Sequence, residues 1–352
     1  MSINPRELRV LEVVDETADA RSIVLCVPDG LGTTFEYRPG QFLTMRIPSE
    51  ETGSVARSYS LSSAPGIDRH LKVTVKRTAG GYGSNWLCDN IRAGDTITVL
   101  PPSGLFTPHS LDVDLLLFAA GSGITPVMSI LKAALHGGSG KALLFYANRA
   151  ADSVIFDAEL RRLRAEHPER LAVEHWLDDE HGVLDPARIE KVARSVPTAE
   201  VFTCGPAAFM DIVGEGVTLA GVPRSRTHRE VFTSLTGDPF AVVGPDAGER
   251  AGTTGGGAAS SAGQADAVVH IGGETHEFGW DRDRTLVDVL LERGVDVPYS
   301  CRSGECGSCA CNLVRGEVAM EKSDILDPED IADGYILGCQ SRPVSGSVEI
   351  SF

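Results

Sequence analysis

The 352-residue sequence lacks a long apolar run and an excess of basic residues. Its longest apolar stretch, Leu115–Ala120, is far shorter than the roughly 18 residues that a membrane-spanning helix needs, so we expect no membrane insertion. Acidic side chains outnumber basic ones by 49 to 32, which gives a formal net charge of -17. Nucleic acid phosphates would be repelled, and a nucleic acid partner is therefore not expected.

The N-terminus also lacks a basic patch followed by an apolar run, so the sequence shows no secretory leader and a cytoplasmic location is expected. Cytoplasmic thiols stay reduced, which would leave the eight cysteines available for metal. From Asp266 onward there are 17 acidic and 7 basic side chains, a net charge of -10. This acidic segment could serve solubility, or it could steer a basic redox partner.

The length predicts two or three domains, and the hydrophobic pattern changes along the chain accordingly. Short alternating runs come first and indicate an antiparallel β-barrel or sandwich. Strands that alternate with helices follow and indicate an open parallel α/β sheet. A Gly-, Ala- and Ser-rich segment comes next and predicts a flexible linker whose ends lie about 25–30 Å apart. The last part predicts a compact α+β domain. The expected boundaries are 1–110, 111–240, 241–265 for the linker, and 266–352.

The most specific motif is a cysteine cluster near the C-terminus. Cys301, Cys306 and Cys309 have the spacing C-x4-C-x2-C, and Cys339 follows far downstream. Plant-type ferredoxins hold a 2Fe-2S cluster with this spacing. A structural zinc site also takes four thiolates, but it usually shows paired C-x2-C knuckles. Cys311 is left over and is expected to pack in the core.

Small residues near the cysteines should help to hold such a cluster. They would let backbone amides turn toward the sulfurs, which tunes the reduction potential. The residues in question are Gly304, Gly307 and Ser308.

A flavin site is predicted in the first domain by the run Arg57-Ser58-Tyr59-Ser60. A flavin needs an aromatic plane, a hydroxyl near its reactive nitrogen and a cation against its phosphate, which Tyr59, Ser60 and Arg57 could supply. By itself the run could also be an ordinary strand with alternating exposure.

Small residues at 80–84 precede a short predicted helix for which Ser84 is the expected N-cap. Free amides at such a terminus suit an anion, here a pyrophosphate, which FAD has and FMN lacks. FAD is therefore expected, although a capped surface helix would have the same pattern. The other predicted cofactor contacts in this domain are Val75, Lys76 and Gly83.

A nucleotide site is predicted where two strands of the α/β domain end. Gly121-Ser-Gly123-Ile-Thr125-Pro126 follows a buried strand and opens a helix, with the proline expected at its first position. The run is shorter than the full G-x-G-x-x-G fingerprint. Cys204-Gly205-Pro206 follows a later strand and could face the same crevice, although its cysteine could simply be packed.

NADH is expected in preference to NADPH. Arg149 could accept a 2'-phosphate, but Asp152 and the acidic run 178–180 would repel it.

Taken in order, these motifs show that the chain resembles the ferredoxin-NADP reductase superfamily. It is most similar to the reductase components of multicomponent oxygenases, notably those of steroid-degrading Rieske systems of the 3-ketosteroid 9α-hydroxylase type. Reductases of phenylacetyl-CoA epoxidases are near relatives. The resemblance implies a β-grasp fold for the last domain and places Glu230 and Phe232, in the segment that closes the nucleotide domain, near the flavin.

The function implied is electron transfer from NADH through FAD and a 2Fe-2S cluster to a separate terminal oxygenase, namely a Rieske steroid hydroxylase. Hydride transfer requires no acid–base pair, so Ser60, Cys204 and Glu230 are interpreted as positioning groups. Service to an epoxidase or diiron monooxygenase stays open, as does a flavin reductase with a zinc-binding C-terminal module. The protein is expected to be a monomer.

Overall fold

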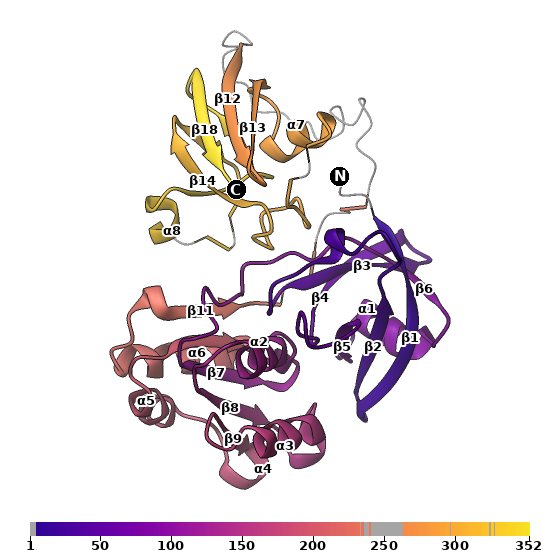
Figure 1. Ribbon diagram of the computed structural model, residues 1–352, viewed down its shortest axis with the longest axis vertical. Coiled ribbons are helices and arrows are strands. Elements are labelled where there is room, and N and C mark those ends of the chain that lie inside the picture. Colours follow the sequence, from indigo (N-terminus) through magenta and orange to yellow (C-terminus); the bar gives the residue numbers. More distant parts are fainter. Residues whose placement is uncertain are drawn as a thin grey trace. The chain divides into compact units, whose positions relative to one another are not determined.

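The computed structural model describes residues 5–232, 234–235, 239–240, 263–295, 297–323, 325–326 and 328–352 (Figure 1). The described residues form two compact units, one spanning Arg6–Phe232 and the other the described residues from 234 to 352. The first unit contains the predicted flavin and nucleotide domains together. The predicted linker lies outside the described residues up to 262, and a strand already begins at Gln264.

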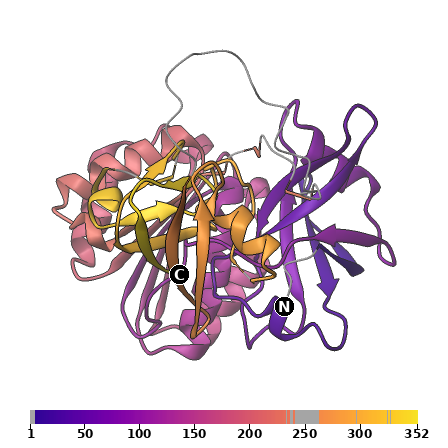
Figure 2. The ribbon, with the colours of Figure 1, turned by 90° about the horizontal axis from the view of Figure 1, so that it is seen from above.

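The N-terminal part of the first unit is an antiparallel sheet of six strands in the order β4-β3-β6-β1-β2-β5. Its strands have the indigo and purple colours of Figures 1 and 2. Alternate residues, such as Leu8 and Val10 or Met45 and Ile47, point into one fully buried core. This alternation is why the sequence predicts the barrel correctly. The elements are β1 (Arg6–Thr17), β2 (Ala20–Cys26), β3 (Phe42–Ser49), β4 (Gly53–Ser60), β5 (Leu71–Lys76), α1 (Tyr82–Asn90) and β6 (Thr96–Val99).

The rest of the first unit is a parallel sheet of five strands in the order β11-β10-β7-β8-β9. Strand β7 is buried on both faces: Leu117 packs in a core with α2 and α3, and Phe118 packs in a core with α5 and α6. The strands are β7 (Leu115–Ala120), β8 (Ala142–Asn148), β9 (Leu171–Leu177), β10 (Glu200–Cys204) and β11 (Thr227–Glu230). The helices are α2 (Ile124–Gly137), α3 (Asp157–Glu166), α4 (Asp178–His181), α5 (Pro186–Ser195) and α6 (Ala207–Leu219).

Two expected helix starts are wrong. Gly81 is the N-cap of α1, so Ser84 is its third residue and not its cap. Helix α2 begins at Ile124, directly after a 3-10 turn at Gly121–Gly123, which puts Pro126 at its third position. In both cases small residues let the chain enter the helix earlier than the capping pattern indicates.

The second unit is an α+β domain with a five-stranded sheet in the order β13-β12-β18-β14-β16 and a separate β15-β17 pair. Strands β12 and β18 are parallel, and helix α7 contributes Leu286 and Leu290 to the core beside Trp280. The elements are β12 (Gln264–Ile271), β13 (Glu274–Asp281), α7 (Leu286–Glu292), β14 (Ala310–Arg315), β15 (Val318–Met320), α8 (Pro328–Ala332), β16 (Tyr335–Leu337), β17 (Ser341–Pro343) and β18 (Ser347–Ser351). Among the helices of the described ranges, none is long and apolar enough to cross a membrane.

Candidate cofactor and cluster sites

The first turn of α1 packs directly on the flavin motif of β4. A Cβ added at Gly83 would lie 2.9 Å from Cγ of Arg57 and 3.6 Å from Oη of Tyr59, so this close approach favours glycine. The structure thus brings the predicted pyrophosphate turn to the predicted flavin-binding strand. Burial raises the pKa of Tyr59, which stays protonated.

Two predicted flavin contacts are engaged within the protein. The Ser84 hydroxyl lies 3.1 Å from the Thr78 amide, which donates to it, so it fixes the preceding turn instead of capping its own helix. The Ser58 hydroxyl lies 3.0 Å from that of Thr44. Val75 has its side chain buried in the barrel core, so only its backbone could touch a cofactor.

Three predicted positioning residues meet where strands end. Ser60 ends β4, and its hydroxyl donates to Oε2 of Glu230, the last residue of β11, at 3.2 Å. Cys204 ends β10 and is paired in register with Glu230. Burial raises the pKa of Glu230 to about 8, and burial together with Glu230 raises the pKa of Cys204. At neutral pH this is a set of uncharged hydrogen-bonding groups, which suits a flavin ring system. Phe232, two residues beyond Glu230, is half exposed.

The two predicted nucleotide loops approach each other closely at positions occupied by glycine. A Cβ at Gly123 would lie 2.1 Å from the Cys204 carbonyl oxygen, and one at Gly205 would lie 2.9 Å from Cβ of Ala120. Neither loop can carry a side chain at these points. The two predicted nucleotide loops therefore lie side by side at the carboxyl ends of β7 and β10, with Pro206 as the N-cap of α6.

The remaining predicted contacts surround the first of these loops. Gly121 has a φ of +52°, and its carbonyl accepts from Oη of Tyr146 at 3.0 Å. The Thr125 hydroxyl donates to the Ser122 carbonyl at 3.0 Å. Nζ of Lys76 lies 3.8 Å from where a Cβ of Gly121 would stand, which puts a cation beside the loop.

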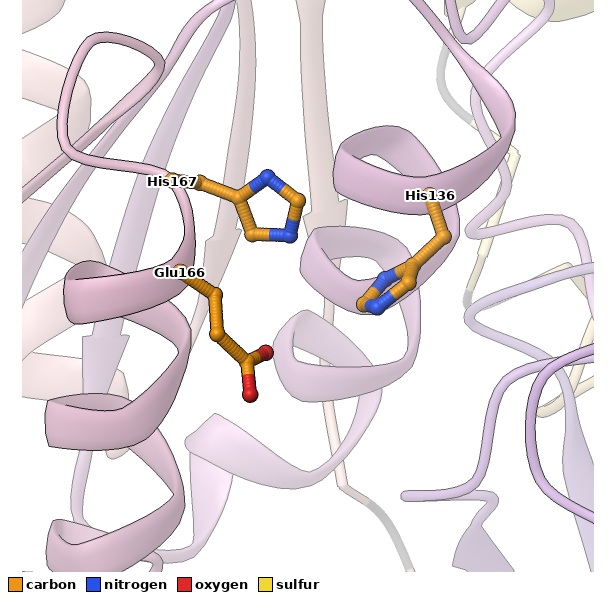
Figure 3. A group of neighbouring side chains, drawn as sticks. All are labelled: His136, Glu166 and His167. Carbon is orange, nitrogen blue, oxygen red and sulfur yellow. The ribbon is translucent and has the colours of Figure 1, made fainter.

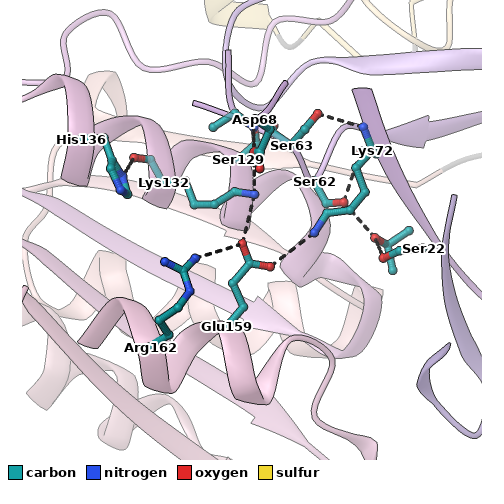
Figure 4. Close-up of polar contacts among 12 residues, drawn as sticks. Ser22, Ser62, Ser63, Asp68, Lys72, Ser129, Lys132, His136, Glu159 and Arg162 are labelled. Carbon is teal, nitrogen blue, oxygen red and sulfur yellow. Dashed lines mark hydrogen bonds and ion pairs between the residues drawn. The ribbon is translucent and has the colours of Figure 1, made fainter. Parts of the chain in front are cut away.

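A charged network that the sequence motifs do not predict joins the barrel to the parallel sheet (Figure 4). Lys132 of α2 is only 2% exposed, and its Nζ lies 2.7 Å from Asp68 and 3.2 Å from Glu159. Lys72 of β5 pairs with the other oxygen of Glu159 at 3.3 Å. The signal was a lysine within the apolar sequence of α2.

The four predicted cluster thiols gather in the second unit. The thiols of Cys306 and Cys339 neighbour that of Cys301 and lower its pKa, and the thiol of Cys339 also neighbours that of Cys309. The sulfurs thus follow one another in a row, in the order Cys306, Cys301, Cys339 and Cys309. No three of these four sulfurs all lie within 4.8 Å of one another.

Backbone amides of the same loop point at the sulfurs. Ser303 and Glu305 donate to Sγ of Cys301 at 3.4 and 3.3 Å, and Cys339 donates to Sγ of Cys309 at 3.4 Å. The turn needs positive φ values, 78° at Gly304, 70° at Gly307 and 58° at Arg302. The expected role of small residues is therefore supported, with Arg302 as an unexpected non-glycine member.

Cys311 lies in β14, two residues beyond Cys309. It is 3% exposed and packs in the core, with its sulfur 3.8 Å from the Ile336 carbonyl. Burial raises its pKa well above the ordinary value, which keeps it a thiol. Its geometry fits the packing role predicted for it.

Comparison with known proteins identifies all three parts of the chain. Family models match an oxidoreductase FAD-binding domain at 7–107, an oxidoreductase NAD-binding domain at 117–215 and a 2Fe-2S iron-sulfur cluster binding domain at 269–344. The structure of phthalate dioxygenase reductase, 25% identical, aligns over 99% of this chain and 98% of that one with a TM-score of 0.58. The last part is thus a 2Fe-2S domain, and the zinc interpretation is superseded.

Two relatives place the chain more narrowly. It is 55% identical over 346 residues to a Rhodococcus rhodochrous "3-ketosteroid-9-alpha-monooxygenase, ferredoxin reductase component", covering 98% of this chain and 96% of the relative. It is 32% identical to a component of the Escherichia coli 1,2-phenylacetyl-CoA epoxidase, covering 98% and 97%. With its FAD-binding, NAD-binding and 2Fe-2S domains in this order, the chain is an oxidoreductase that belongs to the family of ferredoxin reductase components of 3-ketosteroid-9-alpha-monooxygenases.

Proposed function

We propose that the protein takes electrons from NADH and delivers them, through FAD and a 2Fe-2S cluster, to the terminal oxygenase of a steroid 9α-hydroxylating system. The observation that carries this proposal is the presence in one chain of the Ser60–Glu230 pair, with Cys204 beside it, and of a row of four thiols. We assign flavin binding to 1–110, nucleotide binding to 111–240 and cluster binding to 266–352.

In the first unit the residues bind and orient. FAD, when bound, converts a two-electron hydride donor into a source of single electrons. Arg57 supplies positive charge for a phosphate, and the α1 terminus at Gly83 supplies backbone amides. Ser60 and Glu230 form an uncharged hydrogen-bonding surface that excludes water, and Cys204 lies beside Glu230 at the same strand ends. These groups position the reactants at near-contact distance, and none has to take up a proton for hydride transfer.

In the second unit Cys301, Cys306, Cys309 and Cys339 would hold the two irons as thiolates. The amides that point at the sulfurs stabilise the added negative charge when the site is reduced. The acidic surface of this unit would attract a basic partner from solution.

NADH is the proposed donor because acidic side chains at the end of a strand that follows the first nucleotide loop would repel the 2'-phosphate of NADPH. Asp178, Asp179 and Glu180 form exposed α4 directly after β9. Arg149, the available cation, lies 3.5 Å from Asp19, which already balances its charge.

The test is reconstitution with purified terminal oxygenases. The protein is mixed with a 3-ketosteroid 9α-oxygenase component, a 3-ketosteroid and either nucleotide, and the hydroxylated product is measured. We expect product with NADH and much less with NADPH at limiting concentration. Product formation only with a phenylacetyl-CoA epoxidase would reassign the partner. We also propose a cytoplasmic monomer, which size-exclusion chromatography and cell fractionation would check.

A further inference from the structure

Three side chains with metal-binding atoms converge at the ends of two helices, in a place that the electron-transfer function does not use (Figure 3). His136 lies in the last turn of α2, Glu166 is the last residue of α3, and His167 is its C-cap. One ligand atom from each lies within 4.8 Å of the others. Among the described residues, no other group of three or more histidines, cysteines or acidic residues meets this criterion.

The place is remote from the nucleotide loops. Helix α2 starts beside the Gly121–Gly123 turn and has 14 residues, so its far end lies about 20 Å away at 1.5 Å per residue. The three side chains therefore lie toward the other end of the parallel strands, and a ligand bound to them would leave the redox site untouched.

His136 is held as metal-binding histidines usually are. Its Nδ1 lies 2.9 Å from the Lys132 carbonyl oxygen, to which it can donate, and this leaves the lone pair of Nε2 for a metal ion. Metal-bound histidines are commonly oriented by such a bond from the second ring nitrogen. The rings of His136 and His167 stand edge to face, with centroids 5.2 Å apart.

The local charges also favour a cation. The C-terminal ends of α2 and α3 both lie here, and helix C-termini carry partial negative charge. Arg170 is nearby, but its guanidinium is engaged by the carbonyls of Ala134, Leu135 and Gly140. Arg162 competes directly, because its Nη1 lies 2.9 Å from both carboxylate oxygens of Glu166. That pair is exposed and four residues apart on one helix, a weak arrangement that a metal ion could displace.

We propose that His136, Glu166 and His167 form a binding site for one zinc-class divalent ion, with water completing its coordination. Two imidazole nitrogens and one carboxylate oxygen are a donor set that zinc accepts. Small rotations of side chains at this surface bring the three atoms to coordination distance. The bound ion ties the end of α2 to the end of α3 and stabilises the nucleotide-binding part of the first unit.

The test is zinc binding by the tag-free, flavin- and cluster-loaded protein. Titration calorimetry with Zn²⁺, followed by desalting and elemental analysis, should show one equivalent per chain with iron content unchanged. His136→Ala and His167→Ala should each weaken binding about tenfold or more. His70→Ala, which changes a histidine outside the cluster, should bind as the wild type does. Zinc should also raise the melting temperature of the wild type but not of the His136→Ala/His167→Ala variant.

A further variant separates a built site from chance surface binding. Arg162→Gln removes the competitor for Glu166 and should tighten zinc binding, whereas Glu166→Gln should weaken it. Saturable binding that survives in the double histidine variant would overturn the proposal, as would the absence of binding at millimolar zinc. Unchanged affinity in both Arg162→Gln and Glu166→Gln would remove Glu166 from the site and contradict the three-ligand assignment.

Discussion

The flavin–nucleotide unit and the 2Fe-2S unit assemble their sites in opposite ways. In the first, the groups that meet are far apart in the sequence: Ser60 bonds Glu230 across 170 positions. In the second, Cys301, Cys306 and Cys309 share one loop, and amides of that loop supply most of their donors. The first site depends on how two sheets pack, and the second on local backbone conformation.

Because the sites differ in this way, each should be impaired by a different kind of substitution. Disturbing the packing between barrel and parallel sheet should impair NADH oxidation and spare the cluster. Changing one side-chain atom in the cysteine loop should impair the 2Fe-2S cluster and spare NADH oxidation.

The largest expected effect is in the cysteine loop. Cys309→Ser removes a ligand, so we expect iron loss and abolition of electron delivery to an oxygenase. NADH-driven reduction of ferricyanide, which can accept electrons directly from the flavin, should persist. Iron content, visible spectra and both activities are the measurements.

The matched control is Cys311→Ala, which changes the buried cysteine two positions further on. It should keep full iron content and lose about 1 kcal/mol of stability. Loss of iron in this variant would show that the ligand assignment is wrong.

The next effect concerns the packing between the two sheets. Lys132→Met leaves Asp68 and Glu159 without their buried ammonium. Removing one partner of a fully buried pair costs about 3–5 kcal/mol, and because these carboxylates are partly exposed we expect about 2 kcal/mol. Flavin reduction by NADH in stopped flow should slow, while the cluster spectrum and potential stay unchanged.

Lys141→Met, at the exposed position just before β8, is the control and should change neither quantity. If Lys132→Met lowered the stability but left the NADH reaction as fast as in the wild type, the network would be structural only.

The same contrast explains what the sequence could predict. The cysteine spacing is local and chemically specific, so the sequence predicts a 2Fe-2S domain, which the family model confirms, and it predicts four ligands and one packed cysteine. Alternation and helical periodicity gave the order of strands and helices. The lysine within the apolar sequence of α2 is a signal, but it does not identify the network, because the partners of Lys132 lie 64 and 27 positions away in the sequence. Ser84 was misassigned because capping patterns do not show which small residue ends the preceding turn.

A smaller effect should appear in the pH dependence of stability. The pKa of Glu230 is about 8 in the folded protein, well above its ordinary value near 4.3. Between these values the unfolded chain has released a proton that the folded chain keeps, so stability falls as pH rises through this window and levels off above it.

Glu230→Gln removes this titration. The melting temperature of the variant minus that of the wild type should therefore grow from about pH 5 to about pH 8 and then stay constant. Thermal unfolding followed by flavin fluorescence measures it. A difference that stays flat over this range would mean that the carboxyl is already ionised in the folded protein.

The smallest expected effect returns to the cysteine loop. The Ser308 hydroxyl lies 3.2 Å from Sγ of Cys306 and can donate to it as a thiolate. In the wild type this donor stabilises the more negative, reduced state of the cluster. Ser308→Ala removes the donor and therefore that stabilisation. A net hydrogen bond contributes about 0.5–1.5 kcal/mol, so the one-electron potential should become more negative by about 20–60 mV.

Ser303→Ala is the matched control for this change. Its hydroxyl is in the same loop but donates to Glu305 at 3.1 Å and not to a sulfur. The potential of Ser303→Ala should therefore stay close to the wild-type value, while NADH oxidation stays unchanged in both variants. Equal shifts in the two serine variants would mean that loop polarity in general, and not the bond to Cys306, sets the potential. The effect would then be less local than the geometry of this loop indicates.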